Sequence, residues 1–259
     1  MSKKNYASRT IRGKLKVCRY LQADGTLRQY VPKTVSFNRV NLESMAASHS
    51  TLYVKPDVGS LGMGIFKLKR HDSGYTLKEI AGKRQQSRTY SSAGGAYSRI
   101  AAMKSGPMII QQGIKLAKVN NRPYDIRVMV QRKPGKSWTV TGHMVKVGAV
   151  GKIVTNYFQG GAIYTIGKLH RQLGLPEEEG AQRTARLSSI ALQMAKLLSR
   201  KRSGMYEMGI DFAIDNSGRI WVLEVNSNHP QFHPLKTLDR SAYNKMKEYA
   251  RSYGRSAAK

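Results

Sequence analysis

Two carboxylates and an amide near the end of the chain could share a metal ion. Asp211, Glu224 and Asn226 occur in the segment GIDFAIDNSGRIWVLEVN, residues 209–226, which is typical of two strands joined by a turn. Alternation along each strand places all three side chains on one polar face. Carboxylate and amide oxygens are ligands that Mg²⁺ accepts, and phosphates commonly complete its coordination. Taken alone, the same pattern also fits a solvated face that forms salt bridges.

The register of this hairpin decides whether the two carboxylates are neighbours. The apolar positions predicted to share the core are Ile210, Phe212, Ile214, Trp221, Leu223 and Val225. This arrangement predicts Phe212 opposite Trp221, and therefore Asp211 opposite Val222. Asp211 and Glu224 are then diagonal neighbours, roughly 7 Å apart.

A glycine-rich loop between two apolar strands is the second candidate for chemistry. It lies in YVKPDVGSLGMGIFKLKR, residues 53–70, where Lys55 comes just before the loop. The glycines are Gly59, Gly62 and Gly64. Glycines allow a backbone to approach a ligand closely, and backbone N–H groups can cradle phosphate. Lys55 alone fits a surface charge at a strand end, but the loop and the predicted metal face together indicate a nucleoside triphosphate site.

The composition favours an anionic partner. The 259 residues include 45 Lys and Arg against 15 Asp and Glu, a formal charge of +30. Such a charge favours nucleic acid, an anionic polymer or an acidic protein or peptide, although a generally basic proteome or a solubility adaptation explains it as well as a specific nucleic-acid role does.

The remaining composition predicts a soluble cytoplasmic protein. Cys18 is the only cysteine, so no intramolecular disulfide forms, and we expect this thiol to pack in a helix. The sequence has no apolar run of the roughly 18 residues that a membrane span needs.

Helices and strands elsewhere in the chain must position these candidate residues. We expect helices over 14–23, 41–48, 95–104 and 183–202, and strands over 107–113, 124–132 and 137–148, besides the two hairpins. A polar stretch separates the first hairpin from the helix at 95. The long helix should bury one face, formed by Leu187, Ile190, Ala191, Met194, Leu197 and Leu198.

The order of these segments resembles the ATP-grasp fold across most of residues 50–230. The matching segments are Lys55-Pro56, GSLGMG, IIQQGI, DIRVMV, VTNYFQGG and the hairpin 209–226. DIR, TN…GG and WVLEVN most resemble the endospore coat-associated YheC/YheD type, with ribosomal-protein glutamate ligases as a looser relative. The resemblance implies an α+β fold in which two α/β lobes with antiparallel sheets grip ATP. We expect an N-terminal segment (1–45), a small lobe (46–115) and a large lobe (116–259).

The resemblance also assigns roles to individual positions. It implies that Lys55 contacts the α or β phosphate, and that backbone groups of Gln112 and Ile114 hold adenine. The loop over the triphosphate would comprise Gly59, Ser60, Gly62 and Gly64, and the hinge Gln111, Gln112, Gly113 and Ile114. The metal ligands would be Asp211, Glu224 and Asn226, and the catalytic positions Arg127, Lys146 and Asn156, with Asp125 and Gly160-Gly161 matching neighbouring motif positions.

Three features depart from the family pattern. The hinge has no acidic residue to bind ribose, and Lys146 occupies a position where relatives carry arginine. The first 45 residues are too short for the domain that usually precedes the grasp. Lys14 or Lys16 could supply an upstream lysine, but we expect either to be a solvated surface residue.

Two further features have ordinary explanations. His229 and His233 are expected to be loop histidines, because no Cys or acidic residue stands at a zinc-binding spacing from them. Residues 91–95 could form a second phosphate loop but fit a flexible segment better.

The function that the resemblance implies is an ATP- and Mg²⁺-dependent carboxylate–amine or carboxylate–thiol ligase. It would act through an acyl-phosphate on an acidic small molecule, peptide or polymer. The alternative is a degenerate ATP-grasp protein that binds a spore layer, a nucleic acid or another polyanion. The resemblance adds association with the spore to the expected cytoplasmic location.

Overall fold

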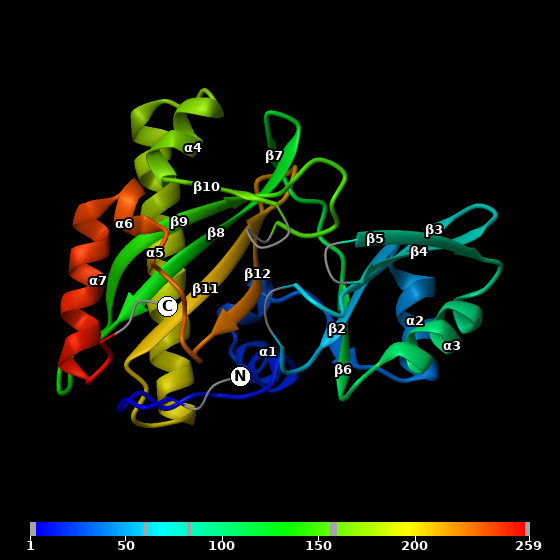
Figure 1. Cartoon of the computed structure of the whole chain (residues 1–259), viewed down its shortest axis with the longest axis horizontal. Coiled ribbons are helices and arrows are strands. Elements are labelled where there is room, and N and C mark those ends of the chain that lie inside the picture. Colours follow the sequence, from blue (N-terminus) through cyan, green and yellow to red (C-terminus); the bar gives the residue numbers. More distant parts are fainter. Residues whose placement is uncertain (1–3, 60–61, 82–83, 156–159, 257–259) are drawn as a thin grey trace.

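The computed structural model describes residues 4–59, 62–81, 84–155 and 160–256. Two six-stranded sheets face each other across a central cavity (Figure 1). The N-terminal sheet has the order β1-β6-β2-β3-β4-β5, and the C-terminal sheet has the order β10-β9-β8-β11-β12, with β7 paired to β8. The expected antiparallel α+β architecture is confirmed, while lobe boundaries at residues 45 and 115 stay a prediction.

The strands of the two sheets range from two to ten residues. The N-terminal sheet contains β1 (Thr34–Ser36), β2 (Thr51–Pro56), β3 (Phe66–His71), β4 (Gly74–Ala81), β5 (Arg84–Tyr90) and β6 (Met108–Gln112). The C-terminal sheet contains β7 (Lys118–Val119), β8 (Arg122–Gln131), β9 (Thr139–Val147), β10 (Ala162–Tyr164), β11 (Glu207–Ile214) and β12 (Ile220–Asn226). The helices are α1 (Lys14–Gln22), η1 (Leu27–Tyr30), α2 (Arg39–Ser48), α3 (Ala93–Met103), α4 (Ile166–Gln172), α5 (Glu177–Lys201), α6 (Leu235–Leu238) and α7 (Arg240–Ser252).

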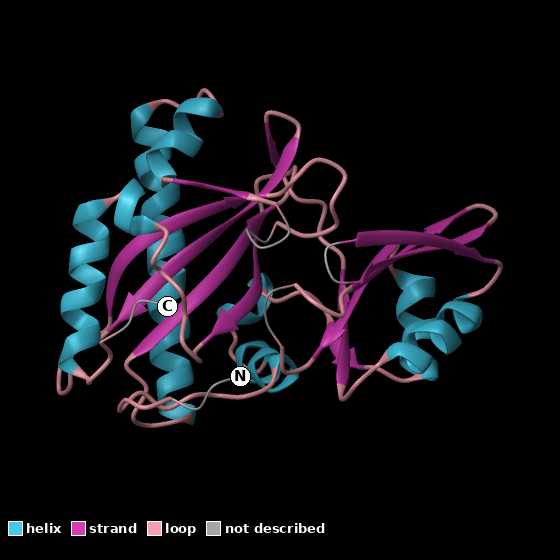
Figure 2. Ribbon diagram, in the orientation of Figure 1, coloured by secondary structure: helices cyan, strands magenta, loops and turns pink. Residues whose placement is uncertain are grey.

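Helices α2 and α3 cover one face of the N-terminal sheet (Figure 2). Phe66 and Leu68 of β3 pack against them, so the alternating Lys67 and Lys69 project from the opposite face. The polar stretch expected after residue 70 is mostly strand, because β4 and β5 pair along their length. Residues 93–95 are the first turn of α3, and Ser92 caps this helix by accepting a hydrogen bond from the N–H of Gly95.

Helices pack on both faces of the C-terminal sheet. Helix α5 packs on one face through the predicted stripe, and all six of its residues are buried. Helix α7 covers part of the other face through Tyr243 and Met246, which contact Met129 and Met144. Cys18 of α1 is buried, as expected, in the same core as α5.

The β11–β12 hairpin has a register different from the predicted one. Asp211 pairs directly with Glu224, and a register shift follows, so that Phe212 pairs with Val222 and not with Trp221. Leu223 is the extra residue at this bulge. Trp221, which was predicted to share the core, instead donates a hydrogen bond to the Asp215 carboxylate (2.8 Å) and lies outside the main core. The two carboxylates of the predicted metal face are therefore closer partners than the sequence suggested.

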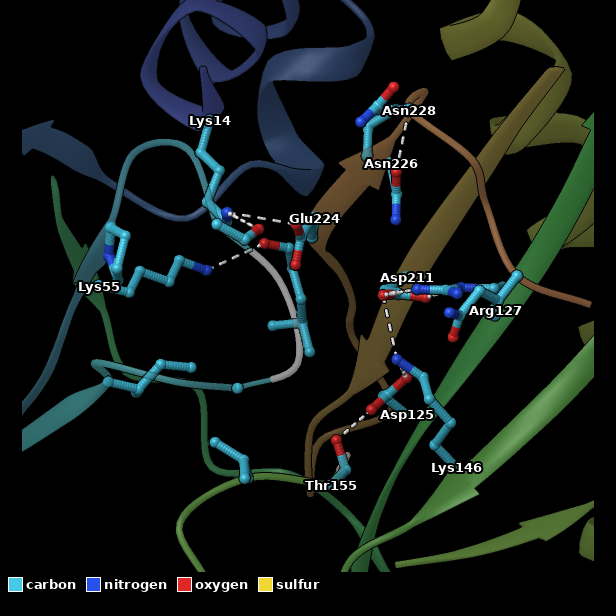
Figure 3. A pocket seen from close by; sticks show the side chains of 18 of the residues that line it. Lys14, Lys55, Asp125, Arg127, Lys146, Thr155, Asp211, Glu224, Asn226 and Asn228 are labelled. Atoms are coloured by element: carbon cyan, nitrogen blue, oxygen red, sulfur yellow. Dashed lines mark hydrogen bonds and ion pairs between the residues drawn. The ribbon is translucent and has the colours of Figure 1, made fainter. Parts of the chain in front are cut away.

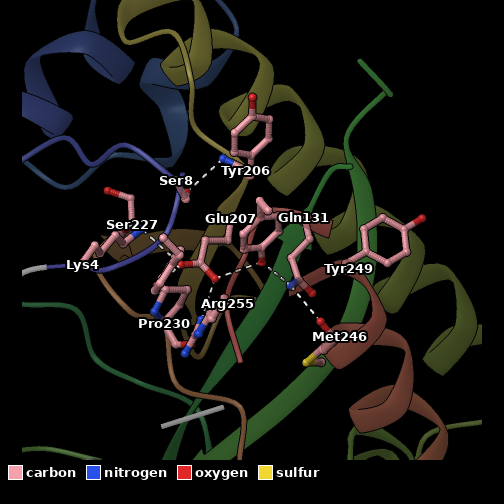
Figure 4. Close-up of polar contacts among 12 residues, drawn as sticks. Lys4, Ser8, Gln131, Tyr206, Glu207, Ser227, Pro230, Met246, Tyr249 and Arg255 are labelled. Atoms are coloured by element: carbon pink, nitrogen blue, oxygen red, sulfur yellow. Dashed lines mark hydrogen bonds and ion pairs between the residues drawn. The ribbon is translucent and has the colours of Figure 1, made fainter. Parts of the chain in front are cut away.

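A fully buried carboxylate joins the two ends of the described chain (Figure 4). Glu207 forms ion pairs with Lys4 (3.1 Å) and Arg255 (2.5 Å). Lys4 also donates to the Ser227 carbonyl (2.8 Å), and Arg255 donates to the Pro230 carbonyl (3.1 Å). This cluster fixes the loop that follows β12.

No helix in the described ranges combines the length and the apolar character that crossing a lipid bilayer requires.

Candidate functional site

A cavity of about 770 Å³ lies between the two sheets and is lined by residues from both, together with residues 10–14 (Figure 3). It brings together most of the predicted site. The predicted residues in its lining are Lys55, Gly59, Gly62, Gln111, Gln112, Ile114, Arg127, Lys146, Asp211, Glu224 and Asn226. Gly64 and Gly113 lie outside the lining, and Ser60 and Asn156 lie outside the described residues.

A buried network of alternating charges occupies the C-terminal wall of the cavity. Arg127 donates two hydrogen bonds of 2.8 Å to Asp211, one to each carboxylate oxygen. Lys146 lies 3.0 Å from Asp211 and 2.8 Å from Asp125. Thr155 donates a hydrogen bond to the second oxygen of Asp125. Adjacent strands position these groups, because Arg127 of β8 is the direct partner of Asp211 on β11.

The network sets opposite pKa shifts on its two aspartates. Burial acts to raise the pKa of Asp211, but the charges of Arg127 and Lys146 lower it to about 2. Burial raises the pKa of Asp125, and the Lys146 charge only partly opposes this effect. The Asp211 carboxylate is therefore ionised at neutral pH.

Lys14 reaches the cavity, contrary to the expectation of a solvated surface lysine. Its ammonium lies 3.3 Å from Glu224 and donates to the Gly59 carbonyl (3.1 Å). Asp57 fixes this position by accepting a hydrogen bond from the N–H of Leu15 (2.8 Å) at the start of α1. Lys14 therefore connects the glycine loop to β12, a role that only the fold reveals. Lys16 is exposed, as expected.

Lys55 points into the cavity from β2. It donates hydrogen bonds to the Gln111 side chain (2.8 Å) and to the Leu223 carbonyl (3.3 Å). Burial lowers the pKa of Lys55, and the Glu224 charge opposes this shift. The buried amide of Gln111 in turn donates to the Thr34 hydroxyl (3.1 Å). The lysine is thus held in place from both sheets.

The predicted hinge requires glycine at one position. The N–H of Gly113 donates to the Thr51 carbonyl (2.8 Å), and a Cβ on this residue would lie 2.6 Å from the Thr51 methyl group. The N–H of Gln112 donates to the Lys33 carbonyl (2.9 Å). The hinge is therefore fixed against β2 and the segment before β1, and Ile114 beyond it lines the cavity.

The glycine loop needs glycine for its backbone conformation. Gly62 and Gly64 have φ of 71° and 65°, values that residues with a side chain rarely adopt. A Cβ on Gly64 would also lie 3.3 Å from the ring of Pro56.

The candidate metal ligands are oxygen donors on one cavity wall. Glu224 and Asn226 lie on β12 beside Asp211, and the Asn226 side chain accepts a hydrogen bond from the N–H of Asn228 (3.0 Å). His229 and His233 also line the cavity. Across the described ranges, however, no three histidine, cysteine or acidic side chains form a group able to hold a metal ion.

Comparisons with curated proteins identify relatives of this chain. It is 28% identical over 244 residues to the endospore coat-associated protein YheD of Bacillus subtilis, and 22% identical over 226 residues to YheC of the same organism. These alignments cover 90% and 87% of this chain but only 53% and 62% of the relatives. The chain thus spans between half and two thirds of the length of these proteins.

Solved structures support the ATP-grasp fold. An ADP complex of the N5-carboxyaminoimidazole ribonucleotide synthetase purK aligns with a TM-score of 0.55 at 14% identity, over 93% of this chain and 51% of that one. The ATP-grasp ligase PsnB, complexed with a phosphomimetic variant of a minimal precursor, Mg and ADP, aligns with a TM-score of 0.51 at 16% identity, over 93% and 58%. At these identities the likeness concerns the fold alone.

A family model confirms the resemblance seen in the sequence motifs. The model of YheC/D-like ATP-grasp proteins matches residues 3–255, nearly the whole chain. The chain therefore belongs to the YheC/D-like ATP-grasp family.

Proposed function

We propose that the cavity binds ATP with Mg²⁺ and that the protein is an ATP-dependent carboxylate–amine or carboxylate–thiol ligase. One observation carries this proposal: four basic side chains and three oxygen donors line the same cavity. They are Lys14, Lys55, Arg127, Lys146, Asp211, Glu224 and Asn226. Cations in a partly desolvated cavity stabilise phosphate charge far better than cations in water do.

The residues divide by the part of the nucleotide that they would contact. Lys55 and the glycine loop would hold the phosphates, because they lie at the N-terminal wall and present an ammonium and backbone groups. Adenine would lie against the hinge at Gln112 and Ile114. Lys14 would also contact phosphate, since it already lies beside the loop at Gly59.

Asp211, Glu224 and Asn226 would hold Mg²⁺. Their oxygen chemistry fits this ion, which prefers hard oxygen ligands and takes others from phosphates and water. Glu224 fits best, because its side chain is 32% exposed and, among the described residues, its one ion pair is with Lys14. The Asp211 carboxylate is more constrained, because Arg127 and Lys146 contact both of its oxygens. When bound, the ion would supply charge neutralisation for the phosphates.

The proposed reaction has two steps. A carboxylate oxygen of the substrate attacks the γ-phosphorus, and the bond to ADP breaks, giving an acyl-phosphate. An amine or thiol then attacks the acyl carbon and gives up one proton to solvent, and phosphate leaves, so that an amide or thioester forms. Arg127 and Lys146 would stabilise the negative charge in these steps, together with Asn156, whose catalytic role the family resemblance implies. No side-chain nucleophile is required.

A second candidate is a nucleotide-binding protein without turnover. It is favoured by the internal neutralisation of Asp211, which leaves neither oxygen of that carboxylate without a cationic partner. Release of ADP in the presence of candidate carboxylates and amines distinguishes a ligase from this alternative. The names of the relatives further suggest association with the endospore coat, which imaging of a tagged chain in sporulating cells would test.

Thermal unfolding with and without nucleotide tests whether the cavity binds ATP, which both candidate functions require. ATP with Mg²⁺ should raise the melting temperature, since a ligand at 100 times its Kd adds about 2.7 kcal/mol to stability. The same titration in excess chelator should give a smaller shift. Absence of any shift at millimolar ATP would overturn the nucleotide site.

A further inference from the structure

The cavity-facing side of the N-terminal sheet carries a lysine cluster that the nucleotide site does not use. Lys67 and Lys69 alternate with Phe66 and Leu68 on β3, and Lys78 on β4 is the direct cross-strand partner of Lys67. Alternation places the three lysines on the face opposite to α2 and α3. We refer to Lys67, Lys69 and Lys78 as the lysine cluster.

The cluster is arranged unfavourably for the protein alone. Like charges directly opposite each other on a sheet are destabilising. None of the three lysines forms an ion pair within the described part of the chain. Burial lowers the pKa of Lys67, and the charges of Lys78 and Lys69 lower it further. By contrast, Arg88 and Arg99 on the helix-covered side share the buried Glu79.

The cluster adjoins the proposed site. Tyr53 lines the cavity and is the strand partner of Lys67, whose ammonium lies 5.6 Å from the centre of the tyrosine ring. The Tyr53 hydroxyl donates to the carbonyl of Ile153 (3.0 Å), which also lines the cavity. Gln85 bonds to the backbone of Gly151 and of Ile153 (both 3.1 Å). The cluster therefore borders the cavity wall without being part of its lining.

We propose that the lysine cluster docks an extended acidic polypeptide, which would be the substrate of the ligase or its carrier. Strand geometry places Lys67 and Lys69 roughly 7 Å apart, and Lys67 and Lys78 roughly 5 Å apart. Carboxylates at alternate positions of an extended peptide have the same roughly 7 Å repeat. Bound carboxylates would remove the repulsion that the cluster carries in the free protein.

Two features favour a peptide over single-stranded nucleic acid. The Tyr53 hydroxyl is already bonded to Ile153, and Lys67 lies over its ring, so the ring is not a free platform for stacking bases. The proposed reaction also consumes a carboxylate, which an acidic peptide carries. The substrate class therefore rests on the proposed function, whereas the location of the docking surface does not.

Binding of a fluorescein-labelled oligoglutamate to charge-matched variants tests the proposal. The test variant replaces Lys67, Lys69 and Lys78 with Gln, and the control variant replaces three exposed lysines of the C-terminal half, Lys136, Lys196 and Lys236. Both lose the same net charge. We expect the test variant to bind at low salt about tenfold more weakly than the parent, and the control to lose far less. Equal losses would show that net charge alone binds the peptide and would overturn the proposal.

Further measurements separate this proposal from folding and from the nucleotide site. The melting temperature of the ligand-free test variant should equal or exceed that of the parent, because a like-charge pair is removed. If the triple variant does not fold, Lys69→Gln alone should weaken oligoglutamate binding, and unchanged binding would overturn the proposal. If the protein does not bind ATP but oligoglutamate binding still depends on the lysine cluster, only the proposed ligase function is overturned, and the docking surface is retained. Tighter binding of a single-stranded oligonucleotide of equal charge would overturn the assignment to a peptide.

Discussion

Asp211 and Glu224 are direct cross-strand partners, placed opposite each other just before the bulge at Leu223. Two like charges in this position would repel. Cations from other elements offset the repulsion, since Arg127 of β8 binds Asp211 and Lys14 of α1 binds Glu224. The exposed fractions of the two carboxylate side chains, 6% and 32%, indicate that Asp211 is also a structural residue and that Glu224 is freer to take up a ligand.

The variant Asp211→Asn should be strongly destabilised. It leaves the buried Arg127 and Lys146 without one of their counter-charges, and breaking a buried ion pair costs roughly 3–5 kcal/mol. Chemical denaturation measures this loss. The exposed pair of Arg39 and Glu43 provides the control, because Glu43→Gln should cost no more than about 1 kcal/mol. Equal stability of the two variants would contradict the buried network.

The variant Lys55→Met should separate binding from folding. Loss of the hydrogen bonds to Gln111 and Leu223 is offset by relief from burying an ammonium, so stability should stay within about 1 kcal/mol of the parent. ATP affinity, measured by calorimetry, should fall at least about tenfold because a charged phosphate contact is lost. The exposed Lys136→Met is the matched control. A full ATP response in Lys55→Met would exclude this lysine from the nucleotide site.

The sequence predicted the elements with strong periodicity. The apolar stripe of α5 and both pocket-forming hairpins were recognisable, because burial imposes a repeat on their residues. Strand β5 was not, since it reads RQQSRTY and is the last strand in the order of its sheet, held by backbone pairing to β4. The neighbouring strand β4 was also hard to recognise, because a charged residue, Glu79, occupies a buried position on its inward face and pairs with Arg99.

The sequence predicted which residues form the site better than it predicted how they are arranged. Motif order indicated which residues line the cavity, but the bulge at Leu223 has no clear sequence signal, so the register was wrong. Lys14 was missed for a different reason. Its position depends on Asp57 capping a helix that is distant in sequence, and no local pattern reports such a contact.

The variant Glu207→Gln should loosen the chain ends and the loop after β12. Lys4 and Arg255 would lose their shared counter-charge in a fully buried position. We expect a loss of about 3–5 kcal/mol in chemical denaturation, and faster proteolysis of the ends. Glu43→Gln again serves as the surface control. A stability change below about 1 kcal/mol would show that the cluster does not fix the termini.

Stability should fall as pH drops below 6.5, partly because of one histidine. Burial, and after it the charge of His170, lowers the pKa of His143 from 6.5 to about 4. As pH falls, His143 is therefore protonated in the unfolded chain before it is protonated in the folded protein. The contribution of neutral His143 to the free energy of unfolding is complete above pH 6.5 and is lost as pH falls toward 4. It amounts to about 3 kcal/mol at most. His143→Gln should flatten the denaturation free energy between pH 4 and 6.5, whereas the exposed His71→Gln should not. Equal slopes in the two variants would contradict this assignment.

The most direct test of the account is the Mg²⁺-dependent affinity for ATP of Glu224→Gln, measured by calorimetry beside Glu248→Gln. Both changes remove one carboxylate charge, but Glu224 lines the cavity and Glu248 forms a surface pair with Lys133. We predict that Glu224→Gln loses at least about tenfold in affinity when Mg²⁺ is present and little in excess chelator, with ligand-free stability within about 1 kcal/mol of the parent. Glu248→Gln should behave as the parent. Retention of the parental Mg²⁺ dependence by Glu224→Gln would contradict the metal-assisted nucleotide site.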